Sequence, residues 1–213
     1  MNIRKSKIIT IAIVLLTFVV SACLYPEMPE KMATHWNPRG AVDGYMSKSL
    51  AVFLMPVIIA VIAALFIFIP KIDPLKVNFE RFRKYYDGFV ILFCAFMLCL
   101  QYFTLLWNIG IRISLNILLP VSLGLLFFYI GILCKHTKRN WFVGIRTPWT
   151  LTSETVWNKT HKIGGKLFKV AGVIIVVGSL FPGYLLCFIL IPVFLIAVFT
   201  LIYSYLEYQK ENP

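Results

Sequence analysis

The run LAVFLMPVIIAVIAALFIFI, residues 50–69, decides the fold class of this chain of 213 residues. None of its twenty side chains is charged. A helix needs about 20 apolar residues to cross the hydrocarbon core of a bilayer, whereas a membrane β-strand needs about half as many. Because backbone polar groups in lipid must be satisfied within the protein, the run predicts a membrane-spanning helix.

Further apolar runs on either side extend this prediction to the whole chain. We expect an all-α fold, a polytopic membrane helix bundle with six transmembrane helices in a single domain over residues 1–213. The predicted spans are residues 8–24, 50–69, 88–107, 113–133, 170–181 and 184–205. Only 14% of the residues are charged, against roughly 25% in ordinary soluble domains, which excludes a typical soluble protein.

The first run has a second interpretation, because residues 20–23 (VSAC) resemble the cleavage box of a bacterial lipoprotein. In that interpretation a leader is removed and Cys23 is lipidated. The spans that follow favour a retained first helix, and an intact mass would distinguish the two. All five cysteines lie in or at the ends of apolar runs without a CxxC pair, so neither a disulfide framework nor a metal site is predicted.

The distribution of Lys and Arg predicts the orientation. The N-terminus, the segment after the second span, residues 134–169 and the C-terminal segment carry 17 of them, against four in the alternate segments. Since positive charge accumulates on the cytoplasmic side, both termini and the 134–169 loop are predicted in the cytoplasm, with the 25–49 loop outside. This asymmetry accounts for the net charge of +12, so no direct nucleic-acid partner is predicted.

The second half of the 134–169 loop has a helical pattern. Ser153 can cap a helix that has Glu154 in its first turn. Four lysines then fall on one side and apolar residues on the other; the lysines are Lys159, Lys162, Lys166 and Lys169. We expect this helix to lie in the inner headgroup layer of the membrane. The alternative is that it is only the basic lead-in to the fifth span.

No pattern in the sequence indicates an enzyme. The predicted spans have no ionisable residue at their centres, which disfavours ion-coupled transport. His35 with Asp43, or His161 with Glu154, would be the candidate acid–base pairs, but such pairs arise easily by chance. We predict no catalytic residue, no metal and no cofactor.

Two groups of residues resemble known family signatures. In the 134–169 loop, ten residues resemble the signature of the SdpI family of bacterial membrane proteins: Asn140, Gly144, Arg146, Thr147, Pro148, Trp149, Thr150, Trp157, Thr160 and His161. In the 25–49 loop, the DUF1648 module that often precedes that signature is resembled by Pro29, Glu30, Thr34, His35, Trp36, Asn37, Gly40, Asp43, Gly44 and Lys48. Together with six spans, the resemblance covers nearly the whole chain.

The resemblance implies a multi-pass protein of the bacterial cytoplasmic membrane, in contact with the lipid bilayer, that gives immunity to a secreted killing peptide. It also implies a second partner, a cytosolic transcriptional repressor held at the membrane. The repressor is expected at Asn140, Gly144, Arg146, Thr147, Pro148, Trp149, Trp157 and His161, unless this stretch merely forms a membrane-capping turn. The peptide toxin is expected at His35, Trp36, Asn37, Gly40, Asp43 and Lys48.

Other functions stay open on the residues alone. A membrane sensor or scaffold for another envelope signal has the same architecture, and a small-molecule transporter or an enzyme are further alternatives. Survival of sensitive cells under added toxin would identify immunity, and flux in sealed vesicles would identify transport. A transcriptional response that is lost on deleting the 134–169 loop, without any gain in resistance, would favour the sensor.

Overall fold

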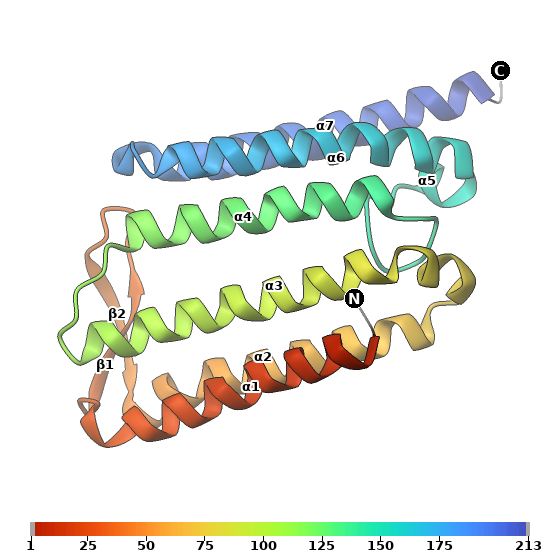
Figure 1. The fold of residues 1–213 in the computed structure, drawn as a ribbon. Helices are drawn as coiled ribbons and strands as arrows, with labels where there is room; N and C mark the ends of the chain where they lie inside the picture. Colours follow the sequence, from red (N-terminus) through yellow and green to blue (C-terminus); the bar gives the residue numbers. More distant parts are fainter. Residues whose placement is uncertain (1–2, 212–213) are drawn as a thin grey trace.

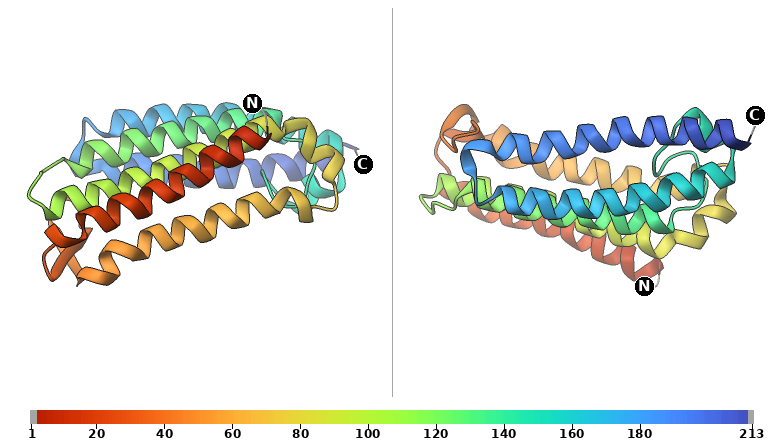
Figure 2. Two further views of the ribbon diagram at one scale, coloured as in Figure 1. Left: turned by 60° about the horizontal axis from the view of Figure 1, so that its bottom comes forward. Right: turned by 90° about the horizontal axis from the view of Figure 1, so that it is seen from above.

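A computed structural model describes residues 3–211 as a bundle of long helices lying side by side (Figure 1). The helices are α1 (Ile3–Leu24), α2 (Lys48–Ile72), α3 (Lys76–Asn108), α4 (Leu115–His136), α5 (Pro148–Thr152), α6 (Glu154–Gly178) and α7 (Leu185–Glu211), with short 3-10 turns at Tyr25–Glu27 and Pro182–Tyr184. An antiparallel hairpin of β1 (Lys31–Trp36) and β2 (Val42–Ser47) crosses one end. Figure 2 shows that α1 begins and α7 ends at the opposite end.

Within residues 3–211, five segments are long and apolar enough to cross a membrane: Ile3–Glu27, Lys48–Ile72, Lys76–Asn108, Leu115–His136 and Pro182–Glu211. The predicted helical membrane bundle is therefore confirmed. The fifth predicted span, 170–181, begins inside α6 and runs past its end at Gly178. Since α6 as a whole is not among the five, a count of six crossings stays a prediction.

The sides of α1 show why this sequence suits lipid. Its buried residues are all small and polar: Ser6, Thr10, Thr17 and Ser21. Several of its large apolar side chains, such as Leu15 and Val19, are more than half exposed. A soluble helix has the reverse arrangement, with its apolar side buried. Close packing through small residues combined with an apolar exterior is typical of membrane helices.

Glycines join α4 and α6 backbone to backbone. A Cβ at Gly131 would lie 2.6 Å from the carbonyl oxygen of Gly165, and a Cβ at Gly124 would lie 2.6 Å from that of Gly172. In each helix the two glycines are seven residues apart, which places them on the same side. The two helices are therefore in contact at two levels, two turns apart, and no larger residue fits between them.

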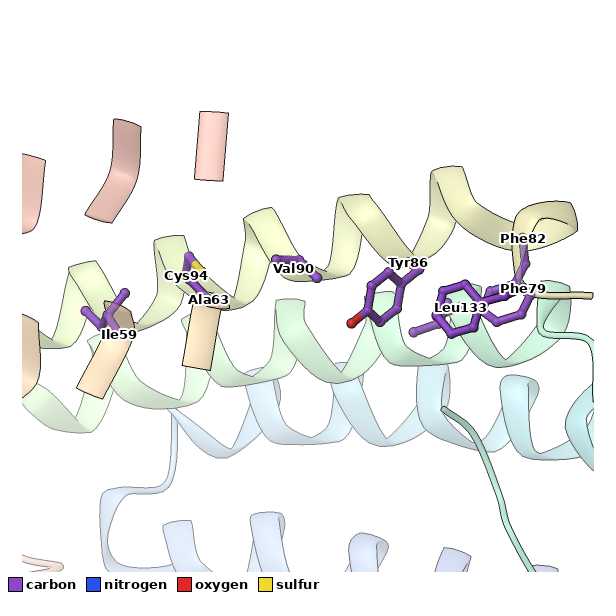
Figure 3. Packing of buried hydrophobic residues seen from close by; sticks show 8 residues of the cluster. All are labelled: Ile59, Ala63, Phe79, Phe82, Tyr86, Val90, Cys94 and Leu133. Atoms are coloured by element: carbon purple, nitrogen blue, oxygen red, sulfur yellow. The ribbon is translucent and has the colours of Figure 1, made fainter. Parts of the chain in front are cut away.

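The main apolar core lies among α2, α3 and α4. Phe79, Phe82 and Tyr86 of α3 are at most 1% exposed, and Figure 3 shows them beside Leu133 of α4. Their spacing of three and four residues explains why α3 begins at Lys76, well before the span predicted at 88–107. The charged residues between these aromatic residues interrupt the apolar run, so the predicted span begins only at residue 88.

The structure adds two features that the sequence did not predict. The 25–49 loop contains a β-hairpin within an otherwise helical bundle. Its turn has Gly40 at a φ of 77°, a conformation that glycine adopts easily. The segment after Ser153 has no separate orientation in the headgroup plane, because α6 continues without a break alongside α4 and α7 (Figure 1).

Candidate functional site

The segment that follows α4 includes α5 and the first two turns of α6. It is folded against the end of the bundle where α1 begins and α7 ends. We call residues 137–161 the signature segment. Asn140 organises its first turn, and its side chain is fully buried. The Asn140 Oδ1 accepts from the backbone N–H groups of Phe142 (2.9 Å) and Val143 (2.7 Å), and its Nδ2 donates to the carbonyls of Lys138 and Val143. These four bonds use the full hydrogen-bonding capacity of the amide.

His161 fixes the next part of the segment. Its Nε2 lies 2.9 Å from the backbone nitrogen of Ile145, and its Nδ1 lies 2.9 Å from the carbonyl oxygen of Trp157. An N–H can only donate and a carbonyl can only accept, so the imidazole is neutral with its proton on Nδ1. Burial lowers the pKa of His161 to about 4, and the bond to the Trp157 carbonyl opposes this only in part.

Gly144 is required beside this imidazole. Its φ is 119°, and a Cβ there would lie 2.4 Å from His161 Nε2. Trp157 completes the cluster: its ring stacks on His161 at a centroid distance of 4.0 Å, and its Nε1 donates to the carbonyl of Thr137 at 3.1 Å. The signature residues Gly144, Trp157 and His161 therefore form one contact, in which Trp157 and His161 are buried.

The second half of the signature segment is held by threonine side chains. Thr147 and Thr150 form a reciprocal cap for α5, in which each side-chain oxygen accepts from the other residue's backbone N–H. Thr150 also donates to the carbonyl of Ile145, and Thr147 donates to Ser204 of α7 at 3.0 Å. Pro148 takes the first helical position, where its missing N–H costs nothing.

Sequence reasoning missed the residue that ties the signature segment to α2. Asp73 is fully buried, and its carboxylate accepts from the backbone N–H of Trp141 at 3.0 Å and of Leu75 at 2.7 Å. On the neighbouring helix, Asn78 donates to the carbonyl of Arg139. The only available signal was the Asp-Pro pair at 73–74, which marks a turn and says nothing of a partner 68 residues away.

The exposed surface of the signature segment differs from our expectation. Trp157 is 0% and His161 is 2% exposed, so neither side chain is presented to a partner, because both are used to hold the loop. Arg146 is exposed and donates to the carbonyl of Trp141 at 2.8 Å. Trp149 is partly buried against Tyr205, with the ring centroids 5.1 Å apart.

The hairpin at the opposite end brings the other predicted residues together. His35 Nδ1 lies 2.5 Å from a carboxylate oxygen of Asp43, and the two side chains are 72% and 43% exposed. The Asn37 side chain accepts from the backbone N–H groups of Arg39 and Ala41, which closes the turn. Lys48, at the start of α2, lies 3.8 Å from Glu30.

The hairpin is fixed to α3 by two contacts. The ring of Trp36 packs edge-on against Phe103 and Trp107, with centroid distances of 4.8 and 5.6 Å. Asn108 pairs with the backbone of Ala33, accepting from its N–H at 2.8 Å and donating to its carbonyl at 2.9 Å. The hairpin therefore has a fixed position over the ends of the helices.

Neither cluster has the arrangement of a metal centre. Across residues 3–211, no three His, Cys, Asp or Glu side chains converge as ligands. The buried cluster around His161 orders the backbone, whereas the hairpin presents an exposed pair of ionisable groups. The two clusters therefore differ in exposure and lie at opposite ends of the molecule.

Comparisons with known proteins match both regions. Residues 136–204 match the SdpI/YfhL protein family, and residues 12–60 match DUF1648, a domain of unknown function. Among curated proteins, the chain is 30% identical over 211 residues to "Immunity protein SdpI" of Bacillus subtilis (strain 168), with 98% of each chain covered. No solved structure matches.

Proposed function

Because this chain belongs to the SdpI/YfhL protein family, we propose that it is an immunity protein of the cell membrane that protects against a secreted killing peptide. The observation that carries this proposal is the 98% coverage of a named immunity protein, which includes both the hairpin and the signature segment. Its five apolar helical segments and this relationship make the chain a multi-pass cell-membrane protein. No catalytic step is part of the proposed role.

The proposed arrangement has six crossings, with the hairpin outside the cell and the signature segment and both termini in the cytoplasm. The 17-to-four distribution of Lys and Arg supports this orientation. The antiparallel course of α6 between α4 and α7 supports a sixth crossing, because its 25 residues span about 37 Å.

We propose that the hairpin receives the peptide. In support, His35 and Asp43 are exposed, and a cavity of about 120 Å³ beneath the hairpin is lined by apolar groups such as Met46, Leu54 and Met55. An amphiphilic peptide offers both the apolar and the polar groups that these features need.

Survival of sensitive cells under added toxin tests immunity. Cells that express the wild-type chain should survive concentrations that kill cells with an empty vector. In cells that express Asp43→Asn, the highest toxin concentration that the cells survive should be several-fold lower than in cells with the wild-type chain. The control Glu27→Gln removes another exposed carboxylate from the same loop and should leave this concentration unchanged. If cells that express the wild-type chain die at the same toxin concentration as cells with the empty vector, an immunity function is excluded.

We further propose that the signature segment binds a cytosolic repressor through Arg146 and Trp149, with Trp141 and Phe142 beside them. The supporting observation is exposure, since Trp141 is 51% and Phe142 is 38% exposed in a segment that is otherwise tightly held. Aromatic and Arg side chains dominate protein contacts energetically. Buried Trp157 and His161 would then position this surface without touching the partner.

Pull-down from cytosol tests this second proposal. Arg146→Ala and Trp149→Ala should each recover at least 5-fold less of the repressor than the wild type. Thr155→Ala, an exposed position on the first turn of α6, serves as the matched control and should recover the wild-type amount. Equal recovery by all four proteins would refute the contact, even if the chain still protects cells.

A further inference from the structure

The end of the bundle with the signature segment contains a basic cavity that the proposed function does not use. It has a volume of about 340 Å³ and lies between α3, α4 and α6. Four cationic side chains line it: Arg81 and Lys84 from α3, Lys135 from the end of α4, and Lys138 from the segment that follows α4. We call these four residues the basic cavity wall.

No carboxylate balances this wall. None of the residues that line the cavity is Asp or Glu, and no ion pair joins any of the four cations to another side chain in residues 3–211. Some of the other cations at this end are paired: Arg83 lies 2.8 Å from Asp87, and Lys159 and Lys210 each lie 2.7 Å from Glu207. An anionic ligand would therefore meet complementary charge on this wall without competition from a carboxylate of its own lining.

The cavity lies where the apolar stretches of two helices end. Lys135 directly follows the uncharged residues 115–134 of α4, and Lys84 lies one turn before the uncharged residues 88–107 of α3. In a membrane, the end of an apolar stretch lies at the level of the lipid headgroups. An anionic group at that level is most readily the phosphate of a phospholipid.

The neighbouring face of α4 suits the rest of such a lipid. The ring of His136 stacks on Tyr85 at 3.7 Å and forms part of the cavity lining. Ile132, Tyr129 and Leu125 precede His136 by 4, 7 and 11 residues, which places them on the same side of α4. All three are partly or largely exposed, and Leu125 is 57% exposed. An apolar path for acyl chains therefore leads away from the cavity.

We propose that this cavity binds the phosphate of an anionic phospholipid between α3, α4 and α6. The lipid is favoured over an acidic protein segment because the cavity combines headgroup level with this apolar path, which a soluble acidic segment has no use for. The site would join the α1–α3 half of the bundle to the α4–α7 half. It does not depend on the immunity function, so resistance assays and lipid binding can fail independently.

Native mass spectrometry of the full chain, delipidated in detergent, tests the site. Phosphatidylglycerol should bind, and phosphatidylcholine with the same acyl chains should bind at least 10-fold more weakly. In Lys84→Gln/Lys135→Gln, the affinity for the first phosphatidylglycerol should fall roughly 30-fold, as expected for two charges near an anionic surface. The control, Lys162→Gln/Lys166→Gln, removes two exposed charges from the other side of α6 and should lose less than 3-fold.

Several results would overturn the proposal. Equal losses in the two double variants, or equal binding of the two lipids, would mean that the cavity has no specific site. Displacement of phosphatidylglycerol by inorganic phosphate would assign the cavity to a soluble anion, and displacement by a short oligoglutamate peptide would assign it to a protein. If the double variant does not fold, Lys84→Gln and Lys138→Gln alone should each weaken binding roughly 5-fold, and an unchanged affinity in both would refute the site.

Discussion

At the scale of single residues, His161 holds the signature segment in place through its neutral form. Its Nε2 accepts from Ile145, and a second proton on the ring would remove that acceptor. The same imidazole leaves no room for a side chain at position 144. The contacts of this one buried ring therefore require the neutral form of His161 and a glycine at position 144.

The first prediction concerns pH. The pKa of His161 is about 4 in the folded protein against 6.5 in the unfolded chain, so the unfolded state binds more protons between these values. The contribution of His161 to the free energy of unfolding should be fully present above pH 6.5 and should be lost as the pH is lowered from 6.5 toward 4. The total loss should be about 3 kcal/mol. Thermal unfolding of the purified protein from pH 8 to 4 measures this. His161→Gln should give a flatter curve than the wild type, and curves of equal slope would contradict the assignment.

The second prediction concerns Gly144. Gly144→Ala places a methyl group at a positive φ and 2.4 Å from His161 Nε2, so we expect a loss of about 3 kcal/mol or more. Gly110→Ala is the matched control, because Gly110 has a φ of 95° but nothing within 4 Å of its Cβ position. That control should lose only about 1 to 2 kcal/mol in thermal unfolding. Equal losses would show that the His161 contact is unimportant.

The signature residues could be identified from the sequence, but their environments could not. Trp157 and His161 were expected at a surface, and both are buried, because side-chain spacing shows which side of a helix is apolar without showing what covers it. Asp73 had no signal at all, since its partner Trp141 is distant in the chain. Asn140 was found only through the family resemblance.

At the scale of elements, the pairing of α4 with α6 carries the second half of the bundle. Two helices that meet through glycine carbonyls gain close dispersion contacts in lipid, where apolar burial alone gives no driving force. Lys159, Lys162 and Lys166 lie on the other side of α6, where Lys159 reaches Glu207 of α7, whereas Lys169 lies over the ring of Phe128 of α4. The helix α6 therefore has glycines on the side that faces α4 and basic residues on the opposite side.

The third prediction tests this pairing. Gly131→Ala puts a methyl group 2.6 Å from the Gly165 carbonyl oxygen, so the backbones must separate, and we expect a loss of about 1 to 3 kcal/mol. Gly183→Ala makes the same change in an open turn with nothing within 4 Å, and its melting temperature should stay within about a degree of the wild type. Identical melting temperatures for the two variants would refute the close packing of α4 and α6.

Element boundaries were predictable only where apolar runs were unbroken. The span at 50–69 lies within α2, whereas α3 begins twelve residues before the predicted 88, because Phe79 and Phe82 pack between charged neighbours. The hairpin was missed since its strands are short and half polar, and are fixed to α3 through Asn108 and Trp36. Such tertiary contacts leave no periodic signal in the sequence.

At the scale of the whole molecule, the two proposed contact surfaces, the hairpin and the signature segment, lie at opposite ends of the bundle (Figure 1). The helical membrane class is predicted from the composition, and the structure agrees with it, because a soluble fold does not accommodate so many exposed Leu, Ile and Val side chains. Function did not follow from physical reasoning, since neither end contains a recognisable chemical motif. The family resemblance supplied it, and the 30% identical immunity protein supports it.

The fourth prediction concerns orientation, on which the roles proposed for the two ends depend. It uses a variant in which the five native cysteines are replaced by alanine, and a single cysteine is then introduced at Arg39 in the hairpin or at Thr155 on α6. A membrane-impermeant maleimide added to intact cells should label Arg39→Cys at once, and should label Thr155→Cys only after the cells are permeabilised. Labelling of Thr155→Cys in intact cells, with Arg39→Cys protected, would contradict the account.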